Sequence, residues 1–380
     1  MKDFKMLYIS TTNLLKKNGG GIATLNFLKI LNYNYGAKNI DVIAPAIRSV
    51  NYDNDISNNI SLVPERTLLR KIKGFFKRHI ELTRYPSFFE TFEWNKYDLI
   101  IFNGGIYSGD LIIRYTRNLP KTIVIHHNFE REYHNFNKSI FNLYGITNYL
   151  IKAREKSSYL NSDLNLFLTV PDKILFENFY GTKSNNHVFN CLLSNNESNS
   201  IIEFSKGLKL VITGSLDHPQ NIDGIIDFFH NYYALVLSIE KNAEFIITGR
   251  NPCKSIIKLT EIFSNVTIIK NPDNINEIVS ICDVYICPVR AGGGLKIKIQ
   301  DALINGLPVI SHCNSARGYE FFFDKDYFET YSNKLEFKEA LQNILDYKKI
   351  KTKANIFNDF TKIFSLNKRC RELKNIFNGI

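Results

Sequence analysis

The segment between residues 288 and 310 combines residue types that could bind a phosphorylated ligand. Three consecutive glycines, 292–294, precede a helical pattern that ends at 306–308, Gly-Leu-Pro, before another apolar run. Glycines let backbone N–H groups approach a ligand closely, and the N-terminus of a helix attracts anions. The segment therefore predicts a binding site for a diphosphate.

Charged side chains accompany these glycines. Lys298 or Arg290 can donate charge-assisted hydrogen bonds to phosphate oxygens. Asp301 is three residues beyond Lys298 and shares its helix face, so its carboxylate can accept the hydroxyls of a ribose. The residues expected to line this part of the site are Arg290, Gly292, Gly293, Gly294, Leu295, Lys296, Lys298 and Asp301.

Further polar residues follow neighbouring apolar runs in the same half of the chain. In open parallel sheets, ligands bind at the carboxyl ends of the strands, so these loops are expected to surround one ligand. Arg250 suits a phosphate, and the backbone after Lys270 could receive the edge of a nucleobase. The expected binding residues of these loops are Gly214, Ser215, Asn221, Arg250 and Lys270.

Two histidines and a glutamate follow the apolar run 122–125 in the first half of the chain. A histidine can take a proton from a hydroxyl group, because its unperturbed pKa is about 6.5. We interpret His127 as the residue that binds the acceptor or accepts its proton, with His126 and Glu130 as alternatives. A structural hydrogen-bonding pair is the competing interpretation. A third convincing ligand is lacking, so no metal site is predicted.

A glycine loop, Gly19-Gly20-Gly21, lies between the first apolar run and a helical pattern. It matches neither a dinucleotide-binding fingerprint nor a P-loop, because no Gly-Lys-Ser/Thr follows. We expect it to contact a donor phosphate or the acceptor, and a loop without a ligand is the alternative.

The elements that position these loops are predicted to be buried parallel strands. Continuous runs such as 98–102 and 244–248 do not alternate with polar residues, which indicates strands covered by helices on both faces. The expected fold is α/β, with two Rossmann-like doubly wound parallel-sheet domains facing a cleft. The predicted domains span 1–185 and 207–361, joined by an Asn- and Ser-rich linker over 186–206.

The composition is that of a soluble globular chain. The 380 residues are 44% hydrophobic and 22% charged, and no run approaches the length of a membrane span. The six scattered cysteines form no CxxC pair, so buried thiols are expected. We expect a cytoplasmic protein.

The net charge of +11 suggests polyanionic partners. Part of this charge lies in residues 66–80, where cations alternate with Leu, Ile and Phe in the pattern of an interfacial amphipathic helix. The sequence therefore predicts a peripheral contact with an anionic membrane, and a core-facing helix with a basic outer face is the alternative. No nucleic-acid-binding motif is present, so no nucleic acid is expected as a partner.

The loops together resemble a known family. Gly214-Ser215, 219–223, 247–249 and above all 288–310 are similar to glycosyltransferase family 4 and its relatives, and 127–130 resembles an "HN-x-E" run of some members. The resemblance implies a GT-B fold and a nucleotide-sugar donor, UDP- or GDP-linked, on the C-terminal domain. It also implies an acceptor on the N-terminal domain, no metal or other cofactor, and a last helix, 362–380, that crosses back to the first domain.

The sequence departs from this family at one position. The family often has two glutamates separated by seven residues; Asp301 matches the second, whereas the first falls at Gly293. The resemblance thus implies Asp301 as the ribose ligand, while backbone amides or Lys296 replace the first glutamate near the donor sugar. A retaining outcome is favoured over an inverting one.

The resulting hypothesis is a metal-independent, hexosyltransferase-like enzyme of class EC 2.4. It would transfer a sugar from the nucleotide-sugar to a glycan or lipid-linked acceptor in surface polysaccharide biosynthesis. Lys298, with Arg250 or Arg290, would stabilise the leaving diphosphate. The alternatives are a sugar-nucleotide epimerase of the same fold and a non-catalytic GT-B partner subunit.

Overall fold

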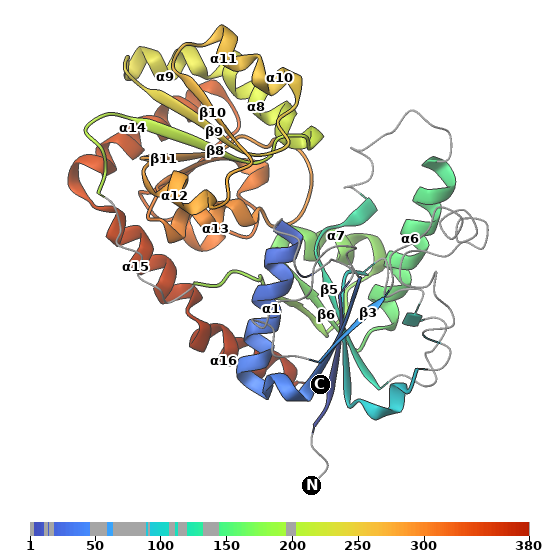
Figure 1. Cartoon of the computed structure of the whole chain (residues 1–380). Coiled ribbons are helices and arrows are strands. Elements are labelled where there is room, and N and C mark those ends of the chain that lie inside the picture. The colour runs from blue at the N-terminus through green and yellow to red at the C-terminus, as the bar shows by residue number, and fades with distance from the viewer. Residues whose placement is uncertain are drawn as a thin grey trace. The chain divides into compact units, whose positions relative to one another are not determined.

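The computed structural model describes residues 4–10, 14, 19–45, 59–63, 89, 92–105, 111–112, 120–131, 144–194 and 203–379. The predicted amphipathic segment 66–80 lies outside these ranges. The chain divides into two compact units: unit 1 comprises Met1–Cys191 and Arg369–Ile380, and unit 2 comprises Leu192–Lys368 (Figure 1). Each unit is built on one parallel sheet, which confirms the expected fold class.

Unit 1 contains a seven-stranded sheet in the order β3-β2-β1-β4-β5-β6-β7. The strands are β1 (Met6–Ser10), β2 (Ile40–Pro45), β3 (Asn59–Val63), β4 (Leu99–Asn103), β5 (Lys121–His126), β6 (Leu164–Phe167) and β7 (Asn186–Val188), and all their pairings are parallel. Every residue of β1 and β4 is buried, as their continuous apolar runs predict.

Helices α1 (Gly19–Tyr35), α6 (Tyr144–Asn161) and α7 (Val170–Tyr180) belong to the same unit, with short 3-10 helices η1 (Ala37–Asn39) and η3 (Trp94–Lys96). Helix α7 begins where a sequence signal places it: the Thr169 side chain accepts a hydrogen bond from the Asp172 backbone N–H, and Pro171 stands in the first turn. The order in sheet 1 changes direction between β1 and β4, so ligands are expected at the carboxyl ends there.

Unit 2 contains a six-stranded parallel sheet in the order β10-β9-β8-β11-β12-β13. Its strands are β8 (Lys209–Ser215), β9 (Glu244–Arg250), β10 (Val266–Lys270), β11 (Val284–Cys287), β12 (Val309–His312) and β13 (Phe328–Tyr331). Its helices are α8 (Pro219–Asn231), α9 (Tyr233–Ile239), α10 (Lys254–Ile257), α11 (Leu259–Ile262), α12 (Ile275–Ser280), α13 (Ile297–Ile304), α14 (Lys334–Ile350) and α15 (Lys353–Phe364), with 3-10 helices η4 (Cys313–Ser315) and η5 (Glu320–Phe322).

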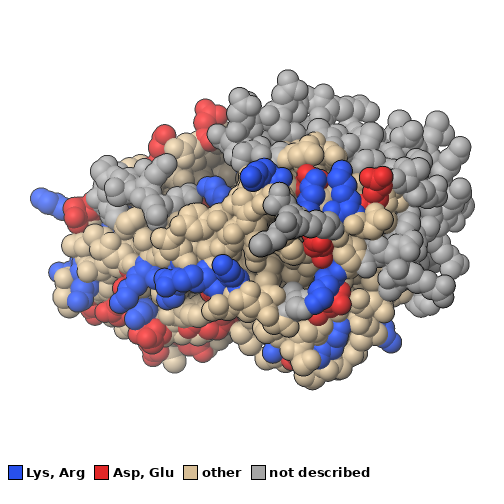
Figure 2. Space-filling model, turned by 90° about the horizontal axis from the view of Figure 1, so that it is seen from below, with Lys and Arg blue, Asp and Glu red and all other residues tan. Residues whose placement is uncertain are grey.

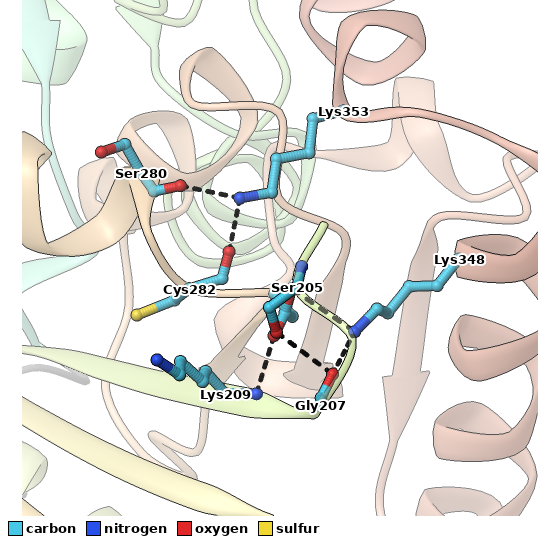
Figure 3. Close-up of polar contacts among 8 residues, drawn as sticks. Ser205, Gly207, Lys209, Ser280, Cys282, Lys348 and Lys353 are labelled. Atoms are coloured by element: carbon cyan, nitrogen blue, oxygen red, sulfur yellow. Dashed lines mark hydrogen bonds and ion pairs between the residues drawn. The ribbon is translucent and has the colours of Figure 1, made fainter. Parts of the chain in front are cut away.

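A buried carboxylate ties several chain segments together at the amino end of this second sheet. Asp283, fully buried just before β11, accepts hydrogen bonds from the backbone N–H groups of Ser205 and Lys209, at 2.7 and 2.9 Å. Lys348 Nζ, from the end of α14, lies 3.4 Å from the same carboxylate and donates to the Gly207 carbonyl (Figure 3). The carboxylate thereby joins the start of β8 to the end of α14.

The neighbouring Lys353 completes this cluster. Its ammonium group donates to the carbonyls of Ser280 and Cys282, at 2.7 and 2.6 Å, although the residue is 1% exposed. A buried charge is tolerated only when it is paired or hydrogen-bonded, and the two carbonyls meet this condition for Lys353. The cluster lies at the amino ends of the strands, whereas the predicted ligand loops lie at their carboxyl ends. We therefore interpret the cluster as stabilising the fold of unit 2.

Helix α16 (Leu366–Phe377) ends the described chain, and its part from Arg369 onward belongs to unit 1. There Arg369 is 3% exposed and donates to the Asn190 carbonyl, while its guanidinium lies over the Phe189 ring at 4.0 Å. Cys370 packs against α1 and donates to the Ile30 carbonyl. Among the helices of the described ranges, none is long and apolar enough to cross a membrane.

Two candidate sites at the carboxyl ends of the sheets

The carboxyl ends of β8 and β9 come unusually close in unit 2. Gly214 and Gly249 are register partners, with φ angles of 152° and 154°. A Cβ atom on Gly249 would lie 1.7 Å from the Gly214 carbonyl oxygen, which no side chain can occupy. Glycine is therefore required at position 249. We call the closely packed backbone of Gly214 and Gly249 the β8–β9 platform.

Lys298 is held over this platform from the first turn of α13. Its ammonium group donates to the Thr213 carbonyl at 3.1 Å and to Asn221 Oδ1 at 2.9 Å. A lysine ammonium carries three N–H donors, so one remains for a ligand. Burial lowers the pKa of Lys298, and a ligand anion beside it would compensate this desolvation.

The glycine loop is packed against α8. Gly292 and Gly294 have φ angles of 94° and 74°, and all three glycines are buried. Lys296 Nζ donates to the Gly293 carbonyl at 2.8 Å. A Cβ on Gly292 would lie 2.5 Å from Gln220 Nε2, a buried amide nitrogen without a hydrogen-bond partner among the described residues. Gln220 thus belongs to the site, although the sequence interpretation did not include it.

Asp301 lies one helical turn beyond Lys298 on α13. Burial raises the pKa of Asp301 to about 7, and within the described ranges no donor contacts its carboxylate. Two hydroxyl donors of a ligand would compensate this group. The geometry is therefore compatible with the expected ribose contact.

Arg290 has a different environment from the one expected. Its guanidinium forms ion pairs with two carboxylates of α8, Asp223 at 2.9 Å and Asp227 at 2.8 Å. Both partners come from a helix that begins 71 residues earlier in the chain, at Pro219. Arg290 therefore ties the strand-end loop to α8, and a contact with phosphate would compete with these pairs.

The remaining donor-side residues lie where the strand-end rule places them. Ser215 is the last residue of β8, and its carbonyl accepts from Asn221 Nδ2 at 2.8 Å. Arg250 and Lys270 end β9 and β10, and both are exposed. Leu295 lies between the glycines and α13. Their contacts with a ligand stay a prediction.

His218, which the sequence interpretation also omitted, precedes the first residue of α8. Burial lowers its pKa, and the nearby charges of Lys298 and Lys296 lower it further. Both effects favour the uncharged form of the imidazole beside the two lysines. Its position directly before the helix could have been noticed from the His-Pro pair after β8.

In unit 1, the two adjacent histidines have different environments. His126 ends β5 and is 1% exposed, with Nε2 bonded to Asn165 Oδ1 at 2.8 Å and its ring stacked on Phe167 at 5.0 Å. Burial lowers the pKa of His126 to about 4. These contacts favour a structural role for His126.

His127 is partly exposed and faces the neighbouring strand end and α1. Its Nε2 contacts Asn103 Oδ1 at the end of β4. Asn103 Nδ2 donates to Thr24 Oγ1 at 2.7 Å, and Thr24 Oγ1 donates to the Gly20 carbonyl at 2.8 Å. The structure thus links His127 to the predicted glycine loop, whose three residues form the first turn of α1. Asn103 follows an apolar run, so the strand-end rule could have identified it.

Two buried carboxyl groups hold the segment after His127. The backbone N–H of Glu130 donates to Glu155 Oε1 at 2.7 Å, and that of Phe129 donates to Asp172 Oδ1 at 3.3 Å. Glu155 and Asp172 are both 0% exposed. Burial raises the pKa of Glu155 to about 8. The backbone at this strand end is therefore fixed from α6 and α7. Within the described ranges, no group of three His, Cys, Asp or Glu side chains could hold a metal.

Residues 207–346 match the family model described as glycosyl transferases group 1. Unit 2 contains a group 1 glycosyltransferase domain. This domain includes β8, the glycine loop, Lys298 and Asp301, so the match covers the whole donor-side geometry described above. It confirms the glycosyltransferase class expected from the sequence. A comparison with curated protein sequences gives no match.

Solved structures of GT-B glycosyltransferases resemble the chain over its full length. HepE from Anabaena in complex with UDP gives a TM-score of 0.69 at 13% identity, covering 99% of this chain and 100% of HepE, and its complex with UDP-glucose gives 0.67 at 14% identity. The lipopolysaccharide outer core galactosyltransferase WaaB gives 0.67 at 13% identity, covering 99% of each chain. Sucrose-phosphate synthase from Thermosynechococcus elongatus gives 0.66 at 11% identity, covering 99% of this chain and 98% of the synthase. At these identities the similarity confirms the GT-B fold.

Within the group 1 glycosyltransferase domain, the structure brings together residues from three strand ends and two helices. Gly214, Asn221 and Lys298 lie in mutual contact, Asp301 lies one turn away on α13, and the glycine loop packs against Gln220 of α8. Arg290 is engaged by α8, while Arg250 and Lys270 extend from the outer strand ends.

Proposed function

We propose that the protein transfers a sugar from a UDP-sugar to a hydroxyl of a glycan or lipid-linked acceptor. The observation that carries the proposal is the pairing of Lys298 and Asp301 on α13. The buried ammonium of Lys298 has one N–H left to donate to a diphosphate. The buried carboxyl of Asp301, one helical turn away, can accept the hydroxyls of the ribose of the same nucleotide. The UDP bound to HepE supports uracil as the base.

In this proposal, the leaving diphosphate is stabilised by Lys298 and by the backbone amides at the start of α13. Charge develops on the diphosphate as the glycosidic bond breaks, and donors already in place stabilise it without reorganisation. Arg250 would provide a further cation. Lys296 and the glycine-loop amides would contact the donor sugar near Gly293, and retention of the anomeric configuration is the expected outcome.

His127 is proposed as the residue that contacts the reacting hydroxyl, with Glu130 beside it. Its support is the position at a strand end next to the glycine loop of α1. Burial lowers the pKa of His127 to about 4, so the ring is neutral near pH 7 and can accept a hydrogen bond.

Surface polysaccharide biosynthesis at the inner face of the membrane is the proposed context. The net charge of +11 supports an anionic partner surface, and Figure 2 shows Lys and Arg side chains gathered in a row on one part of the face seen from below. Binding of the protein to vesicles with and without anionic lipid tests this part: equal binding to both would contradict it.

The central experiment measures the affinity for UDP, GDP, TDP and CMP and their sugar conjugates by calorimetry. We expect UDP to bind, and Lys298→Met and Asp301→Ala each to weaken it at least ~10-fold, the loss of one charge-assisted contact. Asp346→Ala, an exposed residue of α14, is the matched control. Unchanged UDP affinity in both site variants would refute the assignment of the donor site.

A further inference from the structure

The hydrogen bonds around His127 form a chain whose direction is determined at its far end. The Gly20 carbonyl can only accept, and Thr24 Oγ1 lies 2.8 Å from it. A proton must lie between two oxygens this close, and only the Thr24 hydroxyl can supply it. This is the usual bond of a helical threonine to the carbonyl four residues earlier.

The remaining links follow from this first one. Thr24 Oγ1 has donated its proton, so it must accept from Asn103 at 2.7 Å, which requires the Nδ2 amide of Asn103 to face Thr24. The Oδ1 atom of Asn103 then faces His127 Nε2, as the structure has it. A carbonyl oxygen can only accept, so His127 must carry its proton on Nε2.

We propose that Asn103 and Thr24 are positioning residues that hold His127 in the Nε2–H tautomer and thereby leave Nδ1 as a hydrogen-bond acceptor for a substrate hydroxyl. None of the described residues makes a hydrogen bond to His127 Nδ1. The inference rests on the proposed function in assigning that hydroxyl to the substrate; the tautomer itself follows from the hydrogen bonds alone.

Two backbone contacts keep this arrangement rigid, and burial keeps it uncharged. The backbone after His127 is held by Asp172 and Glu155, so the ring cannot readily exchange its two nitrogens by moving the segment. Burial lowers the pKa of His127 to about 4, and the ring therefore has one N–H at neutral pH. Burial also raises the pKa of Tyr8, which lies beside Asn103 and Thr24, well above its usual range, so the Tyr8 hydroxyl is uncharged.

The chemical consequence concerns which group the protein presents to its substrate. A ring with a lone pair on Nδ1 accepts a hydrogen bond from a hydroxyl and thereby orients the hydroxyl oxygen. A ring protonated on Nδ1 would instead donate to a substrate oxygen. The network thus selects a hydroxyl donor as the group recognised at this position.

The test reads the tautomer directly in the free protein. In protein labelled with ¹⁵N-histidine, long-range ¹H–¹⁵N correlations distinguish the two tautomers, and the His127 signals are assigned by their loss in His127→Gln. We expect the Nε2–H pattern in the unmodified protein and in Thr24→Ser, which retains the hydroxyl. Thr24→Val removes it and frees the Asn103 amide, so a mixture of tautomers is expected. A dominant Nδ1–H tautomer in the unmodified protein would overturn the inference.

A second measurement separates this inference from the donor-site proposal. Asn103→Leu should reduce sugar transfer about 10²-fold, the loss expected when a reacting hydroxyl is misplaced, while UDP affinity is unchanged. Asn103→Asp keeps an acceptor oxygen toward Nε2 and should retain the Nε2–H tautomer with a raised His127 pKa. A retained tautomer in Asn103→Leu would contradict the positioning role of Asn103. A changed tautomer with unaffected transfer would remove the substrate role of His127. Lost UDP binding in Lys298→Met bears only on the donor site.

Discussion

Binding of UDP is expected to depend on pH through Asp301. Burial places its pKa at about 7 in the ligand-free protein, and only the ionised carboxylate can accept both ribose hydroxyls. At pH 6 about 9% of such a group is ionised, and at pH 8 about 91%. The dissociation constant for UDP should therefore be about 10-fold larger at pH 6 than at pH 8, a difference of about 1.4 kcal/mol.

The assay is calorimetric titration of UDP at both pH values, with Asp301→Asn as the comparison. The asparagine variant keeps the shape of the side chain but cannot titrate. The phosphate of UDP titrates as well, but it does so equally with both proteins, so their difference isolates Asp301. His218 is present in both proteins, so the same comparison removes its contribution. Asp346→Asn, exposed on α14, controls for the substitution itself.

Stability provides an independent check with a definite sign. Asp301 has a higher pKa in the folded protein than its ordinary value of 3.8, so the folded protein binds the proton more tightly than the unfolded chain. The resulting stabilisation is present at low pH and is lost as the pH rises through about 7. The melting temperature of Asp301→Asn should fall less between pH 6 and pH 8 than that of the unmodified protein.

The binding assay has a clear refuting result. If Asp301→Asn shows the same 10-fold change in UDP affinity as the unmodified protein, Asp301 does not hold the ribose.

Three further substitutions test other parts of unit 2. Gly249→Ala should displace the β8–β9 platform, because its Cβ would meet the Gly214 carbonyl at 1.7 Å; calorimetry should show lost UDP binding, whereas Gly207→Ala, with open space, should not. Asp283→Asn should lower the free energy of unfolding in urea by about 3 kcal/mol, because it leaves the ammonium of Lys348 without its buried partner. Arg290→Gln should change UDP affinity less than ~3-fold, since its guanidinium is engaged by α8, and a ~10-fold loss would restore its role as a phosphate ligand.

Sequence reasoning identified every interior strand of the two sheets and one edge strand, β10. The runs 6–10, 98–102 and 244–248 coincide closely with β1, β4 and β9, because interior parallel strands are covered on both faces and must be apolar throughout. β3, β7 and β13 were not predicted, and all three lie at sheet edges. An edge strand pairs on one side only, so polar residues such as those of β7 are tolerated, and β7 fell within the predicted linker.

In the candidate sites, too, residues close together in the sequence were predictable, whereas contacts between residues far apart in the sequence were not. The glycine loop, Lys298 and Asp301 form one short segment, so the sequence contains their relative placement. The ion pairs of Arg290 and the carboxyl groups that hold Glu130 come from helices far away in the chain, and no local pattern reveals them. The different environments of His126 and His127 also depend on distant partners, Asn165 for one and Asn103 for the other.

The two sites differ in whether they contain buried charged groups that lack a full set of hydrogen-bond partners. This difference determines whether a substitution should change ligand affinity or reaction rate. In unit 2, Lys298 retains a free N–H and Asp301 lacks a donor among the described residues, so a nucleotide would compensate both desolvated groups on binding. In unit 1, the chain from Gly20 to His127 is neutral and its internal hydrogen bonds are complete, so it contributes orientation with little attraction of its own. Substitutions around Lys298 and Asp301 should therefore change affinity and its dependence on pH, whereas substitutions at Thr24 and Asn103 should change the rate of transfer at saturating donor.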